Sequence, residues 1–215
     1  MTFSTSLTPK TPVSNLEARA LTCLRGERVL FSNLSLQIFG GECLHIRGQN
    51  GVGKTSLLRL LTGLSSPETG EILWNGQDIK SQSEQFHRQL LFAGHRDALK
   101  EDLTALENMQ IFAAIDGVVL SEKELLTTLW HFGLRGREDL PVGCLSAGQK
   151  KRVLMARMVS SQAQLWILDE PFNALDTDAV AELQDLIQQH LNNQGLVIMT
   201  SHQALSMPHV QVLDL

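Results

Sequence analysis

The residues between positions 48 and 56 have the types and spacing needed to hold a chain of phosphates. Glycines in this segment let the backbone curl so that successive N–H groups point at phosphate oxygens, and an expected helix after them adds a favourable dipole. Lys54 supplies a point charge for the β- and γ-phosphates, and Thr55 offers a hydroxyl to Mg²⁺. The pattern G-x-x-x-x-G-K-[ST] predicts a nucleoside triphosphate site, whereas a glycine turn that only caps a helix is the alternative. The predicted binding residues are Gly48, Gln49, Asn50, Gly51, Val52, Gly53, Lys54, Thr55 and Ser56.

A second chemical feature is an apolar run, residues 165–168, that ends in the two carboxylates Asp169 and Glu170. A buried strand here would deliver Asp169 to the Mg²⁺ shell, through a bound water, and leave Glu170 where it can polarise an attacking water. A strand that ends in acids is common, so the pair alone indicates little. Its place downstream of a phosphate loop favours the catalytic interpretation over a structural one.

A third polar segment, residues 145–149, comes directly before an apolar helical pattern. Ser146 is suited to cap that helix, and Gly148 permits close approach of another backbone. The N-terminus of this helix could therefore face an anion. The basic run at 150–152 is unfavourable near a helix N-terminus unless an anion or an acidic neighbour is near. A simple cap and a solvated charged face are the alternative interpretations.

The elements that must position these residues alternate along the chain. Continuous apolar strands between helices are typical of an α/β fold with a parallel sheet core, and the start of the chain is expected to be rich in hairpins. Strand patterns lie at 29–38, 42–47, 90–93, 165–168, 196–200 and 210–213, and Asn75-Gly76 indicates a hairpin over 72–79. Helical patterns follow Gly53 and Leu145, occur twice within 103–133, and span 180–191.

Length and composition favour one compact domain. The 215 residues, 43% hydrophobic and 19% charged, are enough for a real core. The net charge of −5 argues against a surface that coats nucleic acid, so no direct nucleic-acid partner is expected. The three cysteines lie far apart and form no metal or redox pattern, which indicates small core hydrophobes in a reducing compartment.

The sequence offers no membrane-spanning segment of its own. No stretch reaches the roughly 18 uninterrupted apolar residues of a spanning helix, and the N-terminus lacks the apolar core of a signal peptide. Residues 1–15, rich in Thr, Ser and Pro, predict a loose tail before a single domain over 16–215. We therefore expect a cytoplasmic protein whose link to a membrane comes through a partner.

The order of these motifs resembles that of the nucleotide-binding subunits of ABC transporters. The phosphate loop, the segment 145–149 (Leu-Ser-Ala-Gly-Gln), the acidic strand end, the segment 173–176 (Asn-Ala-Leu-Asp) and His202 follow one another as in that family, across residues 16–215. The resemblance implies a P-loop NTPase of ABC type. Such a fold has a mostly parallel sheet core, an N-terminal antiparallel β subdomain and an inserted helical subdomain, here at about 96–146.

The family resemblance also implies how two chains share the chemistry. In ABC subunits, the segment equivalent to 145–149 contacts the γ-phosphate held by the other subunit's phosphate loop. A head-to-tail homodimer that hydrolyses ATP with Mg²⁺ in two composite sites is therefore implied. Asp176 matches the loop that crosses the dimer interface, and His202 matches the switch histidine at the γ-phosphate. The residues implied to contact the partner's nucleotide are Ser146, Gly148 and Gln149, and the implied catalytic residues are Lys54, Glu170 and His202.

Within this family, the chain resembles the ATP-binding subunits of bacterial haem exporters used in cytochrome c biogenesis. The likeness lies in residues 25–31, 94–95 and 103–108. It implies integral membrane partner subunits, a peripheral place on the cytoplasmic face of the inner membrane, and export of haem or release of a haem-loaded chaperone. The alternatives are an ABC transporter for another substrate and a non-transport ABC ATPase. A small-molecule kinase with a P-loop would not explain the segment 145–149 or His202.

Two positions depart from the family pattern. His95 stands in the neighbourhood of a glutamine that usually couples Mg²⁺ and water to the membrane subunit. Because Mg²⁺ prefers hard oxygen ligands, we expect His95 to act through a bridging water. The aromatic residue that commonly stacks on adenine is also missing. Leu24 could supply an apolar face there, or Arg25 a guanidinium plane.

Overall fold

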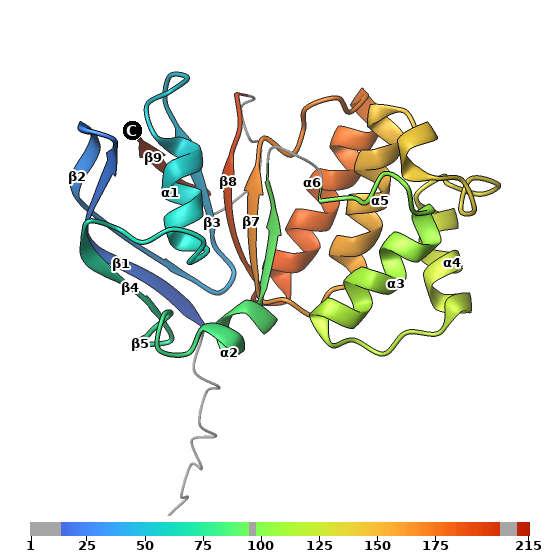
Figure 1. The fold of residues 1–215 in the computed structure, drawn as a ribbon, viewed down its shortest axis with the longest axis horizontal. Helices are drawn as coiled ribbons and strands as arrows, with labels where there is room; N and C mark the ends of the chain where they lie inside the picture. The colour runs from blue at the N-terminus through green and yellow to red at the C-terminus, as the bar shows by residue number, and fades with distance from the viewer. Residues whose placement is uncertain (1–13, 95–97, 203–209) are drawn as a thin grey trace, which may run out of the picture.

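The structure is a computed structural model, and it describes residues 14–94, 98–202 and 210–215. It contains an antiparallel sheet, a parallel sheet and two groups of helices, one on each side of the parallel sheet (Figure 1). Most of the predicted tail, residues 1–13, and His95 lie outside the described residues. The predicted α/β fold, with a parallel sheet core and an antiparallel N-terminal part, is confirmed.

The antiparallel sheet has the strand order β2-β1-β4-β5. The predicted hairpin after residue 72 is confirmed, since Asn75 and Gly76 both have positive φ, 52° and 79°, as a two-residue type I′ turn requires. The sequence patterns did not predict the first strand. Its pairing register shifts between Ala18 and Leu21, where Ala20 has φ 49°, and such a bulge breaks the period-two alternation. The strands are β1 (Asn15–Arg25), β2 (Arg28–Phe39), β4 (Thr69–Trp74) and β5 (Gln77–Asp78).

The parallel sheet has the strand order β6-β7-β8-β3-β9, and every pair in it is parallel. Its central strands β7 and β8 are buried along their whole length, which is why their sequences are continuous apolar runs rather than alternating ones. All five strands were predicted. They are β3 (Cys43–Arg47), β6 (Leu90–Ala93), β7 (Leu165–Asp169), β8 (Leu196–Thr200) and β9 (Val210–Asp214).

Helical periodicity predicted every long helix and missed only a short one among the described residues. The missed helix, α2, has six residues and a single buried side chain, Phe86, which is too little for a periodic signal. Among the described helices, none combines the length and the apolar character needed to cross a lipid bilayer. The helices are α1 (Lys54–Leu61), α2 (Ser83–Arg88), α3 (Ala105–Asp116), α4 (Glu122–His131), α5 (Ala147–Ser160) and α6 (Thr177–Asn192), with a 3-10 turn at Val142–Cys144.

The parallel sheet separates two apolar cores. Leu165 and Ile167 of β7 face α1 and the antiparallel sheet, whereas Trp166 and Leu168 face α3 to α6. Figure 1 shows the same division, with α1 on one side of the central strands and the other long helices on the opposite side. Helix α5 packs against α3 and α4 and also against α6, so it joins the predicted helical insertion to the rest. The insertion's limits, about 96–146, stay a prediction.

The cysteines divide into two kinds. Cys23 and Cys43 are buried small hydrophobes, as predicted, and burial raises the pKa of the Cys43 thiol to about 12. Cys144 is exposed, so the prediction of a core role was wrong for this residue. It ends the 3-10 turn before α5, a connection that runs over the surface.

A stacked ring pair lies at the edge of the helical core. The rings of Trp166 and His190 are parallel within 5°, with centroids 3.8 Å apart. His190 Nε2 lies 3.1 Å from the backbone oxygen of Gln164, to which it donates. A Cβ on Gly195 would overlap the imidazole, so glycine is required there. Burial lowers the pKa of His190 to about 4.

We expect His190 to make the protein less stable in mild acid. The imidazole pKa is about 4 in the folded protein, below its ordinary value of 6.5, so the unfolded chain binds more protons between these pH values. Stability from neutral His190 is therefore fully present above pH 6.5 and is lost as pH falls toward 4, by up to about 3 kcal/mol. Urea unfolding at several pH values should show a flatter decline for His190→Gln than for the wild type. Parallel curves would contradict this role.

Candidate active site

The phosphate loop connects β3 to α1, and its glycines have conformations that other residues rarely adopt. Gly48, Gly51 and Gly53 have φ values of 146°, 80° and 124°. Helix α1 begins directly after Gly53, and no side chain caps it. The first N–H groups of a helix have no intrahelical partner, so this end of α1 is suited to bind an anion. Gly48, Gln49 and Val52 shape the loop without lining the cavity described below.

The hairpin formed by β1 and β2 packs directly over the loop. A Cβ on Gly53 would lie 3.3 Å from Leu30 Cβ and 3.3 Å from Phe31 Cδ1. Such contacts are tighter than ordinary van der Waals packing, so a side chain at this position would push the hairpin away. Glycine is therefore required at position 53 by packing as well as by φ.

Lys54 lies within the curve of the loop. Its Nζ donates to the backbone oxygens of Gly48, at 2.8 Å, and Gln49, at 3.3 Å. The residue is only 9% exposed, yet it lines the cavity. Two carbonyls therefore hold the ammonium group in place, and its charge is directed at the space that phosphates would fill.

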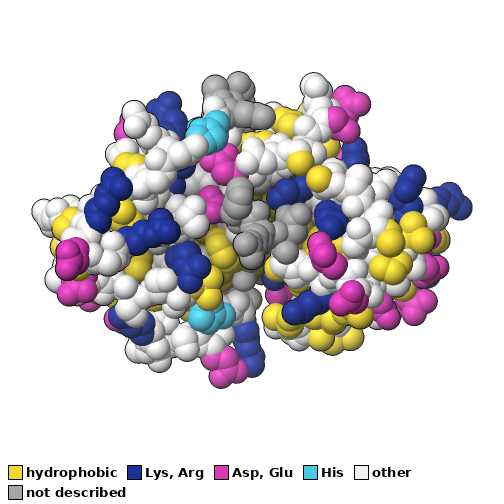
Figure 2. Space-filling view, turned by 45° about the horizontal axis from the view of Figure 1, so that its top comes forward, with side chains coloured by type: hydrophobic (Ala, Val, Ile, Leu, Met, Phe, Trp, Pro, Cys, Tyr) yellow, Lys and Arg dark blue, Asp and Glu magenta, His cyan; other side chains and the backbone are white. Residues whose placement is uncertain are grey.

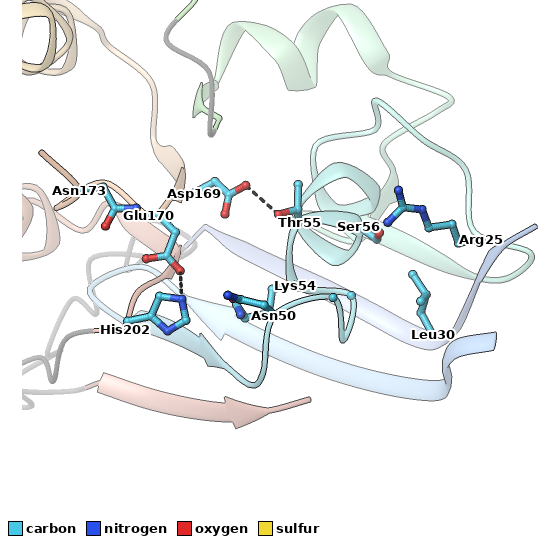
Figure 3. Close-up of a pocket in the computed structure, with 12 residues that line it drawn as sticks. Arg25, Leu30, Asn50, Lys54, Thr55, Ser56, Asp169, Glu170, Asn173 and His202 are labelled. Carbon is cyan, nitrogen blue, oxygen red and sulfur yellow. Dashed lines mark hydrogen bonds and ion pairs between the residues drawn. The ribbon is translucent and has the colours of Figure 1, made fainter. Parts of the chain in front are cut away.

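The two acids at the end of β7 have different surroundings. Asp169 is 4% exposed, and its Oδ2 accepts a hydrogen bond from the Thr55 hydroxyl at 2.9 Å (Figure 3). Glu170 has φ 53°, a left-handed conformation that is uncommon for a residue with a side chain and concentrates at functional sites. The turn directs its carboxylate toward His202, whose Nε2 lies 3.5 Å from Glu170 Oε1.

These side chains meet at a cavity of about 470 Å³, a size suited to a small-molecule ligand. Figure 3 shows Glu170 and His202 on one side of Lys54, and Arg25 and Leu30 on the other. The cavity therefore presents the groups for phosphate chemistry at one end and the β1–β2 hairpin at the other. It is lined by Arg25, Leu30, Asn50, Gly51, Gly53, Lys54, Thr55, Ser56, Asp169, Glu170, Asn173 and His202.

The hairpin end of the cavity contains no aromatic side chain among the described residues that line it. Of the two residues suggested for contact with a base, Arg25 lines the cavity and Leu24 does not. Leu30 also lines it, and sequence reasoning missed this residue. The strand pattern placed Leu30 in a strand, but nothing in that pattern indicated that the hairpin would fold over the phosphate loop.

The other predicted nucleotide residues form a second group, away from this cavity. Ser146 caps α5 in a capping box with Gln149, and Asp176 caps α6 by accepting from the Ala179 N–H at 2.8 Å. The group is compact, because a Cβ on Gly148 would lie 3.5 Å from the Ala174 backbone oxygen. None of Ser146, Gly148, Gln149 and Asp176 lines the cavity.

Acidic neighbours balance the basic run at the start of α5. Lys150 Nζ lies 3.0 Å from Glu101 Oε1, and Arg152 lies 3.3 Å from Glu182 and 3.8 Å from Asp176. Opposite charges nearby offset the unfavourable interaction of these cations with the helix dipole. These acidic neighbours account for Lys150 and Arg152 near the helix N-terminus without a bound anion.

Two buried polar residues near the site were not identified from the sequence. Thr200 ends β8 and is fully buried, and its hydroxyl donates to Asp169 Oδ1 at 2.7 Å. His45 on β3 is 3% exposed, and its Nε2 lies 3.0 Å from the backbone oxygen of Ser201. The only available signal was a polar residue within or at the end of an otherwise apolar strand.

The donor set fits Mg²⁺. The Thr55 hydroxyl and the Asp169 carboxylate lie side by side and both line the cavity, next to the space for phosphates. Mg²⁺ takes oxygen ligands, keeps several waters and is often held by one or two protein groups together with substrate phosphates. Thr55, and Asp169 through a water, could therefore hold the ion.

Comparisons with known proteins agree with this geometry. The family model described as "ABC transporter" matches residues 31–173. The "Cytochrome c biogenesis ATP-binding export protein CcmA" of Dechloromonas aromatica is 49% identical over 93% of this chain and 98% of its own length. The protein of the same name from Nitrosomonas europaea is 46% identical, with coverage of 95% and 96%.

Solved structures are similar over most of the fold. A putative ABC transporter ATP-binding protein from Pyrococcus furiosus superposes with a TM-score of 0.80 at 25% identity, covering 93% of this chain and 96% of that one. The cbiO1 protein from Clostridium perfringens, part of the ABC transporter complex cbiONQ, gives a TM-score of 0.70 at 26% identity. It covers 87% of this chain and 78% of its own.

We expect Lys54→Ala to weaken ATP binding by roughly 10- to 100-fold, the range for loss of a hydrogen bond to a charged group. Isothermal titration with MgATP measures this effect, and circular dichroism checks the fold. Lys80→Ala is the matched control, because Lys80 is an exposed lysine that does not line the cavity. Equal affinities of the two variants would show that the loop does not hold the triphosphate.

Proposed function

This chain belongs to the ABC transporter family, and we propose that it is the ATP-hydrolysing subunit of an export complex that serves cytochrome c biogenesis. The observation that carries ATP hydrolysis is the meeting of Lys54, Asp169, Glu170 and His202 at one cavity. The link to cytochrome c biogenesis rests on relatives that match nearly the whole chain at 45–49% identity.

The cargo that we propose is haem, or a haem-loaded chaperone whose release the complex drives. This proposal rests on the resemblance of residues 25–31, 94–95 and 103–108 to haem exporter subunits. It also agrees with the printed names of the relatives, which describe export proteins of cytochrome c biogenesis. ABC ATP-binding subunits work with membrane transporter subunits, and we propose that those partners carry the substrate path.

In the proposed mechanism, the loop N–H groups and Lys54 bind the β- and γ-phosphates of ATP and fix the γ-phosphorus near the end of β7. Glu170 polarises a water and takes its proton as the oxygen attacks phosphorus, and the bond to the β-phosphate oxygen breaks to release ADP and phosphate. Mg²⁺ held by Thr55 and Asp169 would neutralise charge on the phosphates. We propose that His202, which lies 3.5 Å from Glu170, contacts the γ-phosphate.

We propose that a second copy of the chain completes each site. The N-terminus of α5, with Ser146, Gly148 and Gln149, does not line the chain's own cavity. Its first N–H groups and the helix dipole suit an anion. A head-to-tail homodimer would place this helix start over the γ-phosphate bound by its partner, with Asp176 at the interface.

We expect Glu170→Gln to bind ATP but hydrolyse it at least roughly 100-fold more slowly, because the amide cannot take the proton from water. The trapped ATP should hold two chains together, so light scattering after size exclusion should report a dimer in MgATP. The double variant with Lys54→Ala is the control. It should remain monomeric at a MgATP concentration that saturates Glu170→Gln but lies below the dissociation constant of the Lys54→Ala variant. A Glu170→Gln protein that binds MgATP yet stays monomeric would contradict the composite site.

A groove between the two halves of the chain is our candidate for the membrane partner. It has a volume of about 530 Å³ and lies among α2, β6 and the ends of α3 and α5. Leu64 and Ile115, 56% and 68% exposed, line it together with the ion pair of Asp116 and Arg157. Figure 2 shows a notch between the two halves on this face, with hydrophobic side chains along its borders. Exposed apolar groups beside a few charges suit an amphipathic helix of a partner.

We expect Ile115→Asp to weaken binding of the membrane subunits by about 10-fold or more, because it places an unpaired charge in an apolar contact. Pull-down of the reconstituted complex and partner-stimulated ATP hydrolysis measure this effect. Val119→Asp is the matched control, since Val119 is 98% exposed and does not line the groove. Equal losses in both variants would show that the groove is not the docking site.

A further inference from the structure

Thr200 joins the two acids of the candidate site through one hydroxyl group. Its Oγ1 donates to Asp169 Oδ1 at 2.7 Å and accepts the backbone N–H of Glu170 at 2.9 Å. The residue is fully buried, and Asp169 is 4% exposed. A hydroxyl can donate once and accept in the same geometry, so this one is used in both roles.

The position of Thr200 follows from the register of the sheet. Strands β7 and β8 are parallel, and the last pair in their ladder joins Asp169 to Thr200. Glu170 then leaves the strand in its left-handed conformation, φ 53°, and its N–H binds the Thr200 side chain rather than a strand carbonyl. The hydroxyl thus stabilises a backbone turn that directs the Glu170 side chain toward the cavity.

The Asp169 carboxylate is held on both oxygens. Thr200 donates to Oδ1, and Thr55, in the first turn of α1, donates to Oδ2 at 2.9 Å. Two donors on opposite oxygens fix the plane of a carboxylate, whereas one donor leaves it free to rotate about its Cβ–Cγ bond. Without the Thr200 hydroxyl, the orientation of Asp169 relative to Thr55 would no longer be set.

A second hydrogen bond holds the end of β8 in place. His45, buried on the neighbouring strand β3, lies with Nε2 3.0 Å from the backbone oxygen of Ser201, the residue after Thr200. The chain that carries Thr200 is therefore fixed from the β3 side as well as by its ladder with β7. The hydroxyl is held by a rigid element, as a group that orients other side chains must be.

We infer that Thr200 is a positioning residue, which sets the orientation of the Mg²⁺-facing Asp169 and the water-polarising Glu170 relative to each other. The inference rests on the roles proposed above for these two carboxylates. Thr200 does not line the cavity, so it acts on the reaction only through them. Loss of its hydroxyl should therefore change the Mg²⁺ requirement and the turnover rate more than the affinity for nucleotide without metal.

The experiment compares the full-length wild type with Thr200→Val, Thr200→Ser and Thr62→Val. Valine keeps the shape of threonine without its hydrogen bonds, and serine keeps the hydroxyl. Thr62 is the matched control, because it is also fully buried and its hydroxyl both donates, to the Arg59 backbone oxygen, and accepts, from the Leu64 N–H, at the end of α1. The measurements are kcat, the Mg²⁺ concentration for half-maximal hydrolysis, and ATP affinity in EDTA.

Thr200→Val should raise the Mg²⁺ concentration for half-maximal hydrolysis and lower kcat, each by roughly 10-fold or more, the usual effect of losing an outer-shell partner. Its ATP affinity in EDTA should match the wild type. Thr200→Ser should restore the Mg²⁺ requirement, and Thr62→Val should leave it unchanged.

Three results would overturn the inference: Thr200→Val behaving like Thr62→Val, Thr200→Ser failing to rescue, or a Thr200→Val defect confined to ATP affinity. If Thr200→Val does not fold, Thr200→Ser and Thr200→Ala carry the test, since they differ only in the hydroxyl. A wild-type chain without Mg²⁺-dependent hydrolysis would instead overturn the proposed function itself.

Discussion

The site depends on one carboxylate whose two oxygens accept hydrogen bonds from different parts of the fold. Asp169 ends β7, Thr200 ends β8, and Thr55 lies at the start of the helix that follows β3. Neighbouring parallel strands deliver their carboxyl ends to one edge, so residues more than a hundred positions apart become neighbours. The glycine loop, the turn at Glu170 and His202 all lie at this edge. A change in the strand order would separate them, whatever their sequence motifs.

The parts of the fold that sequence could predict are those with a local cause. Strands β7 and β8 of the parallel sheet are apolar because both of their faces are buried, and the loop before Lys54 has a spacing that few other structures require. Helix α2 was missed because a six-residue element with one buried side chain has no period. The first strand was missed because a bulge at Ala20 breaks its alternation. These failures come from short or irregular elements, in which the local pattern is weakest.

The chemical groups of the site could be predicted from the sequence, but the residues that hold these groups in place could not. Lys54, Asp169 and Glu170 carry motifs, and the structure brings them to one cavity. Leu30 and Thr200 carry none, because their importance comes from packing and register between segments distant in the chain. The segment around Ser146 lies between these two cases, because only part of its role could be predicted. Its motif predicted a helix start, which the capping box forms, and the partner that we propose for this helix start lies on a second copy of the chain.

The hairpin that rests on Gly53 has an evolutionary consequence. A side chain at position 53 would lie unusually close to Leu30 and Phe31, and this restriction comes from packing rather than from phosphate binding. A descendant that had abandoned nucleotide chemistry would still be selected to keep this glycine as long as it kept the hairpin. The described structure constrains the Lys54 side chain only through its hydrogen bonds to two loop carbonyls. In a paralogue that has lost ATP hydrolysis, a glycine at this position would therefore show only that the hairpin packing is kept. Only the lysine would indicate that the protein still binds and hydrolyses nucleotide.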